Sequence, residues 1–214
     1  YGLLDEMTEA WENTPKVPHE KKTILVAPSW QKDNIMDSCI DQLIEQFLRP
    51  GVRLIIRPHP QYVRLYGEKI EGLQSRYKDK LGEDFILQTD FSSTDTVYSA
   101  DLLVTDWSNV GFEFALSTLK PVLYINTPMK IMNPEYDKID VVPFDIRIRG
   151  QLGGELELSQ LDRAGDVAQD LLSRPEEFRE TIQAVKEKEI YNLGHGAEAA
   201  GRYIVKRLGS RKTQ

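Results

Sequence analysis

The stretch LLVTDWSNVGFEFALSTLKPVLYI occupies residues 102–125 and has the pattern of a strand, a polar turn, a short helix and a second strand. Its two ends, at residues 102–105 and 122–125, are short apolar runs of the kind found in buried strands of a parallel sheet. The turn and the helix start carry polar side chains, namely Thr105, Asp106, Ser108, Asn109 and Glu113. Backbone N–H groups at such a helix start point outward and can bind a phosphate.

Three more strands are expected upstream, at residues 23–27, 53–57 and 85–87, where compact apolar runs end at turn residues. Helices are expected at residues 37–48, 61–79, 93–100, 161–172, 176–189 and 197–208. Strands that alternate with helices at this spacing indicate βαβ units. The sequence therefore predicts an α/β fold, a Rossmann-like parallel sheet flanked by helices. Residues 127–154 are rich in Pro, Asn and Asp and are expected to form a loop.

The chain is expected to contain one main domain. Residues 1–22 have the composition of a linker or of the end of a preceding domain. Residues 23–208 are expected to form a Rossmann-like domain, and residues 209–214 a disordered tail. Because the chain opens on Tyr1 rather than Met and carries no signal peptide, we expect it to be a piece of a longer protein.

Composition limits the classes of function. The formal net charge of −7 disfavours a nucleic-acid partner, because neutralising phosphates requires an excess of basic residues. No apolar run approaches the roughly 20 residues needed to span a bilayer. The single cysteine, Cys39, permits no internal disulfide and favours a reducing compartment, so a cytoplasmic location is expected. No metal-ligand spacing, P-loop or GxGxxG motif is present, and no cofactor or metal is expected.

Ligands of open α/β sheets bind beyond the carboxyl ends of the strands. Five polar turns follow the expected strands and would ring one pocket, at residues 29–32, 58–60, 88–90, 105–109 and 126–128. His59 stands between two prolines, which fix the backbone and hold the ring at the strand end. Arg57, at the end of the same strand, could add positive charge.

Each of these features also has a structural explanation. We expect Ser108 or Asp106 to cap the helix that follows, and a plain helix cap with Glu113 solvated or paired with a lysine would account for the same pattern. His59 could be packed into its turn for shape. A hydrolase built on Ser108 and His59 is disfavoured, because Ser108 does not lie in a GxSxG elbow.

Three segments carry a resemblance to a known family: APSW at 27–30, RPHP at 57–60, and VTDWSNVGFEFALSTLKPVLYI at 104–125. They resemble the carboxy-terminal half of the CDP-glycerol:poly(glycerophosphate) glycerophosphotransferases, the teichoic-acid polymerases and primases. The resemblance runs from about residue 21 to 206. It implies that residues 23–208 are the donor-binding half of a GT-B fold, in which two Rossmann-like domains form the enzyme.

The resemblance also implies roles for individual residues. Ser108 and Asn109 would hold the donor pyrophosphate, with Asn109 replacing a second serine that is common in the family. His59 would be the catalytic histidine beside the transferred phosphate, and Glu113 would bind the ribose. The remaining donor-site residues implied at the strand ends are Thr105, Asp106, Arg57 and Ser29.

The reaction implied is transfer of a polyol phosphate from CDP-glycerol, or a related nucleotide donor, to a lipid-linked polyol-phosphate or saccharide acceptor. The general base would belong to the missing N-terminal half of the same protein. A lipid-linked acceptor would also place the protein peripherally at the inner face of the plasma membrane. Two alternatives stay open: another GT-B nucleotide-sugar enzyme such as a UDP-GlcNAc 2-epimerase, and a catalytically idle nucleotide-binding or scaffolding domain.

Overall fold

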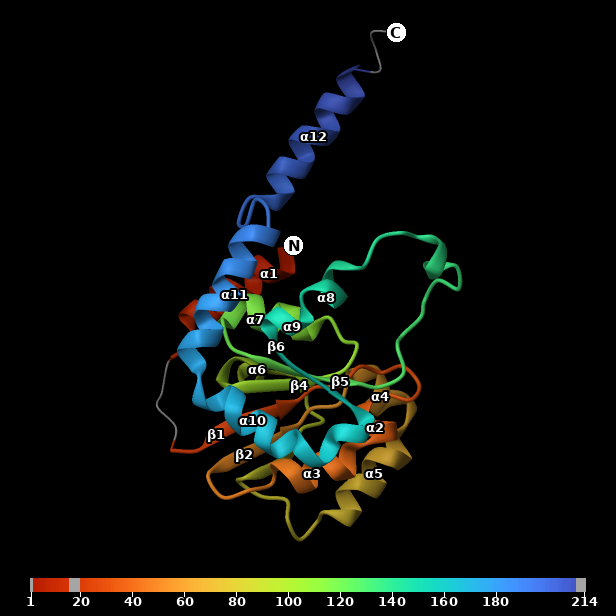
Figure 1. Ribbon diagram of the computed structural model, residues 1–214, viewed down its shortest axis with the longest axis vertical. Helices are drawn as coiled ribbons and strands as arrows, with labels where there is room; N and C mark the ends of the chain where they lie inside the picture. Colours follow the sequence, from red (N-terminus) through yellow and green to blue (C-terminus); the bar gives the residue numbers. More distant parts are fainter. Residues whose placement is uncertain (1, 16–19, 211–214) are drawn as a thin grey trace.

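The computed structural model describes residues 2–15 and 20–210, and it contains a six-stranded parallel sheet between two layers of helices (Figure 1). The strand order is β3-β2-β1-β4-β5-β6. The strands are β1 (Lys22–Val26), β2 (Val52–Ile56), β3 (Phe85–Leu87), β4 (Leu102–Thr105), β5 (Val122–Asn126) and β6 (Gly153–Glu157). The Rossmann-like α/β prediction is confirmed.

The chain order reverses between β1 and β4, the two central strands. From β1 the chain runs outward through β2 to β3, and it then returns to add β4, β5 and β6 on the other side. β1 and β4 pair in parallel, with Ile24 opposite Leu102 and Val26 opposite Val104. In open α/β sheets a ligand crevice forms at such a switch point, beyond the carboxyl ends of the strands.

Alternate side chains of each strand enter two separate cores, as the period of a strand requires. Ile24 and Val26 of β1 pack toward α2, α3 and α10, whereas Leu25 packs toward α1, α7, α9 and α11. The α-helices are α1 (Gly2–Asn13), α2 (Ile35–Ser38), α3 (Ile40–Phe47), α4 (Pro60–Leu65), α5 (Gly67–Arg76), α6 (Asp95–Ser99), α7 (Val110–Thr118), α8 (Phe144–Arg147), α9 (Arg149–Leu152), α10 (Ala164–Ser173), α11 (Pro175–Glu189) and α12 (Gly196–Ser210). Short 3-10 helices are η1 (Tyr136–Lys138) and η2 (Leu158–Arg163).

Two of the predicted helices are divided. The predicted helix at 37–48 is present as α2 and α3, which meet at Cys39. The predicted helix at 61–79 is present as α4 and α5, which meet at Tyr66. Cys39 is only 4% exposed, and burial, followed by the negative charge of Asp106, raises the pKa of its thiol to about 12.

The ends of the chain are more helical than expected. Residues 1–22 include α1, which packs against α7 and buries Leu4 in the core of that face. α12 projects away from the sheet (Figure 1) and extends to Ser210, so the expected disordered tail begins inside a helix. Residues 16–19 and 211–214 lie outside the described residues.

The expected loop at 127–154 is wrong at its end, where α8, α9 and the start of β6 lie. The β6 sequence GGELE has no β-branched residue and offers little strand propensity. Its pairing with β5 supplies the missing stabilisation, with Val122 opposite Gly153 and Ile125 opposite Leu156. Gly153 is required by this close approach, because a Cβ there would lie 2.0 Å from the Val122 carbonyl oxygen.

Gly153→Ala is therefore expected to destabilise the fold by about 1–3 kcal/mol, because the backbone of β5 cannot move away from the added methyl group. Gly154→Ala is the matched control. A Cβ on Gly154 meets only side chains, the nearest being Val167 at 3.4 Å, so a change of about 0.5 kcal/mol or less is expected. Urea unfolding of both variants tests the assignment of β6, and equal effects would contradict it.

Candidate functional site at the switch point of the sheet

The Asp106 carboxylate joins the turns that follow the two central strands. One oxygen, Oδ1, accepts hydrogen bonds from the Ser29 and Trp107 amides, both at 2.8 Å, and Oδ2 accepts one from the Ile35 amide at 3.1 Å. Asp106 is 1% exposed. Three amides from β1's turn, the start of α2 and β4's turn thus converge on one buried carboxylate, a strong arrangement because the acceptor is charged.

This arrangement corrects the expected helix cap. Neither Ser108 nor Asp106 caps α7, because the N-cap position is Asn109, whose side chain makes no capping bond. The Asp106 oxygens are occupied on the β1 side of the switch point. The Ser108 carbonyl accepts from the Gly111 amide at 3.2 Å, and Asn109 is exposed. The start of α7 therefore lies at the switch point of the sheet, and Ser108 and Asn109 directly precede it.

The first turn of α7 packs directly on the sheet. A Cβ on Gly111 would lie 2.7 Å from Tyr124 Cε1 and 3.1 Å from Thr105 Cγ2, so only glycine permits this approach. Thr105 is fully buried, and its hydroxyl donates to the Ala27 carbonyl at 2.7 Å. The structure thus places Thr105 beneath the turn, where it ties β4 to β1.

The His59 ring is fixed by a hydrogen bond as well as by its flanking prolines. His59 is the N-cap of α4, and its Nδ1 accepts from the Gln61 amide at 3.1 Å. Burial, and then the positive charge of Lys130, lower the pKa of His59. A neutral imidazole that accepts at Nδ1 carries its proton on Nε2, which leaves one N–H available to donate. The Trp30 ring lies 6.2 Å from the His59 ring.

The predicted site residue Arg57 is directed to the segment that follows β3. Its Nη1 donates to the Ser93 carbonyl at 3.0 Å and to the Thr96 hydroxyl at 3.1 Å. Its guanidinium carbon lies 5.3 Å from the centre of the Phe91 ring. Arg57 therefore anchors the start of α6, and the structure gives it no contact with the turn at Asp106.

Glu113 lies on α7, one helical turn beyond the polar turn, and is half-buried. Burial raises the pKa of its carboxyl group. A partly desolvated carboxylate gains from hydroxyl donors that replace lost water. This environment suits recognition of a diol.

Polar side chains without a protein partner gather on both sides of β4. Ser29 Oγ and the Gln31 side-chain amide follow β1, and Thr127 Oγ1 follows β5; all are buried and make no hydrogen bond within the described part of the chain. Most buried polar atoms in proteins are paired, so such atoms mark positions where a ligand can complete the hydrogen bonding. Gln31 and Thr127 were not singled out from the sequence as individual site residues, although their turns were.

Sequence reasoning also missed Arg149, which lies in the segment predicted to be a loop. It is 3% exposed, and its guanidinium carbon lies 4.2 Å from the centre of the Trp107 ring. The tripeptide Ile148-Arg149-Gly150 has no pattern that would distinguish this arginine from a solvated one.

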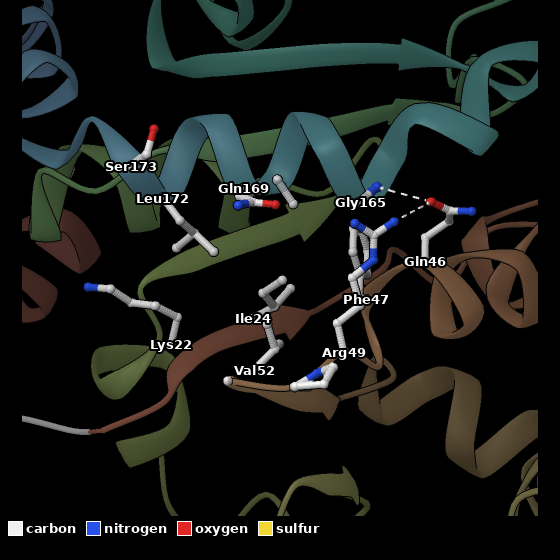
Figure 2. Close-up of a pocket in the computed structure, with 13 residues that line it drawn as sticks. Lys22, Ile24, Gln46, Phe47, Arg49, Val52, Gly165, Gln169, Leu172 and Ser173 are labelled. Atoms are coloured by element: carbon white, nitrogen blue, oxygen red, sulfur yellow. Dashed lines mark hydrogen bonds between the residues drawn. The ribbon is translucent and has the colours of Figure 1, made fainter.

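Several hollows are present in the described part of the chain. A cavity of about 320 Å³ between α3 and α10 lies at the amino ends of β1 and β2, lined by Phe47, Gly165 and Leu172 among others (Figure 2). It is at the edge opposite the polar turns. A hollow of about 570 Å³ is formed within residues 129–146, and Lys130 from its rim lies 6.0 Å from the centre of the Trp30 ring.

Metal and membrane features were searched over the described ranges 2–15 and 20–210. There, no group of three or more His, Cys, Asp or Glu side chains could hold a metal ion. No helix in this part of the chain has the length and apolar character required to cross a membrane.

Residues 5–131 match the sequence profile of the family described as CDP-Glycerol:Poly(glycerophosphate) glycerophosphotransferase, which is more than half of the chain. The chain belongs to this glycerophosphotransferase family. The Bacillus subtilis (strain 168) teichoic acid glycerol-phosphate primase is 28% identical over 125 residues, or 56% of this chain and 29% of the primase. This chain thus spans less than a third of that relative.

The fold of this chain is similar to that of a solved structure. The Anabaena protein HepE, solved in complex with UDP and glucose, matches with a TM-score of 0.53 at 10% identity, over 94% of this chain and 52% of that chain. The wall teichoic acid polymerase TagF matches with a TM-score of 0.49 at 19% identity, over 100% of this chain and 48% of that chain. The chain has the fold of the C-terminal domain of a GT-B enzyme.

Asp106→Asn is expected to destabilise the folded chain, because the new amide group would face the Ile35 amide where Oδ2 now accepts. Each buried donor left without an acceptor costs about 1–3 kcal/mol. Urea unfolding measures the loss. Asp84→Asn, on the surface beside Lys21, is the control and is expected to change little. A variant at position 106 as stable as this control would contradict the role of Asp106.

A second prediction concerns pH. The folded-state pKa of His59 lies below the unfolded value of about 6.5, so the unfolded chain binds this proton first as pH falls. The stabilisation from neutral His59 is thus lost below about pH 6.5. His59→Asn retains an N-cap acceptor and does not titrate. The melting temperature of the wild type, relative to this variant, should fall between about pH 7.5 and pH 5. A constant difference would contradict the assignment.

Proposed function

We propose that this chain is the donor-binding half of a glycerophosphotransferase, and that it holds CDP-glycerol or a related CDP-polyol at the switch point of the sheet. The observation that carries the proposal is the turn between β4 and α7, which the Asp106 carboxylate holds to the turn of β1 and to the start of α2 at the switch point of the sheet. Family membership supports a donor of this class.

The donor pyrophosphate would lie at the start of α7, where Ser108 and Asn109 can donate to its oxygens. The helix dipole favours an anion there by about 0.3–1 kcal/mol at an exposed site and up to about 2 kcal/mol when partly buried. Ser29, whose Oγ lacks a protein partner, would approach from the β1 side. Glu113, one turn further along α7, would accept the ribose hydroxyls.

The proposed chemistry is phosphoryl transfer. An acceptor hydroxyl attacks the phosphorus that bears glycerol, a new P–O bond forms, and the bond to the CMP oxygen breaks. His59 would donate from Nε2 to a phosphate oxygen as charge develops, while Nδ1 keeps its bond to Gln61. Catalysis would then depend on positioning and charge stabilisation. The proton of the acceptor hydroxyl would leave to a base on the N-terminal half.

The remaining partners are proposed from the family. Since the chain spans 29% of the curated relative, a separate N-terminal half would supply the acceptor site and the general base. The acceptor would be a lipid-linked polyol phosphate or saccharide. The complete enzyme would then work peripherally at the inner face of the plasma membrane.

Calorimetric titration with CDP-glycerol, CMP, UDP and UDP-GlcNAc tests the proposal. The wild-type chain is expected to prefer the cytidine nucleotides. Ser108→Ala and His59→Ala should each weaken their binding about tenfold or more, because a hydrogen bond to a charged group contributes about 1.5–3 kcal/mol. Ser173→Ala on α10 and His195→Ala before α12 are matched controls on other surfaces and should leave affinity unchanged.

The other outcomes are equally informative. A preference for uridine nucleotides that depends on Ser108 would indicate a different GT-B nucleotide-sugar enzyme. Cytidine binding that neither substitution alters would place the donor elsewhere in the chain. No nucleotide binding by folded chain would contradict the donor-binding role for this segment and favour a scaffold.

A further inference from the structure

Arg149 is a buried cation beside the candidate site. Its guanidinium carbon lies 4.2 Å from the centre of the Trp107 ring and 4.4 Å from that of Tyr124. Stacking of this kind uses the flat face of the guanidinium and leaves its edge for hydrogen bonds. Trp107 belongs to the polar turn and Tyr124 supports the first turn of α7 at Gly111. Arg149 therefore contacts both supports of the proposed phosphate site.

The hydrogen bonding of the Arg149 guanidinium is incomplete within the described part of the chain. Its Nη2 donates to Asn126 Oδ1 at 3.1 Å, and its Nε lies 3.7 Å from Glu155 Oε2 without a hydrogen bond. The carboxylates of Asp106 and Asp145 act on it electrostatically. Burying a cation costs free energy unless it is paired and hydrogen-bonded. We therefore expect the buried Arg149 to have a role that offsets this cost.

Trp107 connects Arg149 to the polar turn. Trp107 Nε1 donates to the Thr127 carbonyl at 2.8 Å, and the Trp107 amide donates to Asp106 Oδ1. The ring is thus held at its edge by the carbonyl of Thr127, the residue after β5, and on its face by Arg149. Ser108 is the next residue of the turn and directly precedes Asn109, the N-cap of α7.

We propose that Arg149 is the positioning residue of the phosphate-binding turn: its stacking on Trp107 holds the turn in the conformation that binds the pyrophosphate of a nucleoside-diphosphate donor. The inference rests on the proposed function for its ligand, although the effect on Trp107 can be measured without one. Arg149 itself does not touch the ligand, and it acts through Trp107.

The test compares Arg149→Met and Arg149→Lys with Arg147→Met. Methionine removes both the charge and the planar guanidinium group, whereas lysine keeps the charge but has no guanidinium group, so both variants lose the stacking. Arg147 is a nearby control on the surface, where it pairs with Glu189. Both Arg149 variants should weaken CDP-glycerol binding at least tenfold, while Arg147→Met stays within twofold of the wild type. A folded Arg149→Lys that binds CDP-glycerol as the wild type does would overturn the proposal.

The second measurement follows the Trp107 ring alone, in a background with Trp11→Phe and Trp30→Phe. Loss of the Arg149 contact should shift the emission of Trp107 and increase its quenching by acrylamide at least twofold. Unchanged emission and quenching in both Arg149 variants would overturn the inference. A wild type that binds no nucleotide, but whose Trp107 responds to these substitutions, would reject the proposed function and keep the positioning role.

A double-mutant cycle separates positioning from general destabilisation. If Arg149 acts through Trp107, then Arg149→Met adds less than twofold to the loss of CDP-glycerol affinity already caused by Trp107→Leu. Losses that multiply instead would show that the two residues act independently and would overturn the proposal. Melting curves confirm that each variant is folded at the titration temperature.

Discussion

The rest of this site depends on one buried carboxylate that accepts three backbone amides. Asp106 takes these bonds from residues that lie 77 and 71 positions earlier and from its own neighbour Trp107. A parallel sheet cannot close such a distance with a hairpin, since each crossover requires a helix. At the switch point the carboxylate therefore connects two chain segments, as a short turn connects two strands of an antiparallel sheet. It fixes two loops relative to one another, and with them the direction of α7.

The support beneath the turn is equally specific. Thr105 bonds across to β1, and the absence of a side chain at Gly111 allows α7 to rest on Tyr124. Arg149 also contacts the polar turn, with its guanidinium over the Trp107 ring. The contacts of Thr105 and Arg149 join residues from different βαβ units, whereas Gly111 and Tyr124 belong to the same unit, β4-α7-β5. The site therefore depends on tertiary contacts as well as on local ones. His59 is the exception, because a local bond to Gln61 fixes its ring.

The sequence was sufficient for what depends on local pattern. The strands β1 to β5 and the polar turn at 105–109 were predictable, because buried apolar runs and strand-end polar residues have a short period and clear boundaries. β6 was not, since Gly153 owes its strand conformation to pairing with Val122. The hydrogen bond between Asp106 and α2 could not be predicted from the sequence. A carboxylate just before a helix predicts a local cap, and only the folded chain shows that Asp106 accepts from the first amide of α2. Arg149 stood in a segment without periodicity, where nothing distinguishes a buried arginine from an exposed one.

The thiol of Cys39 can report on local opening of the fold. Cys39 lies where α2 meets α3, and both its burial and the charge of Asp106 oppose ionisation. Because only the thiolate reacts with alkylating reagents, the native chain protects this side chain by chemistry as well as by access. Modification of Cys39 would require α2 to leave the carboxylate that holds its first amide. The rate of labelling would therefore follow separation of the two central turns, with no engineered probe.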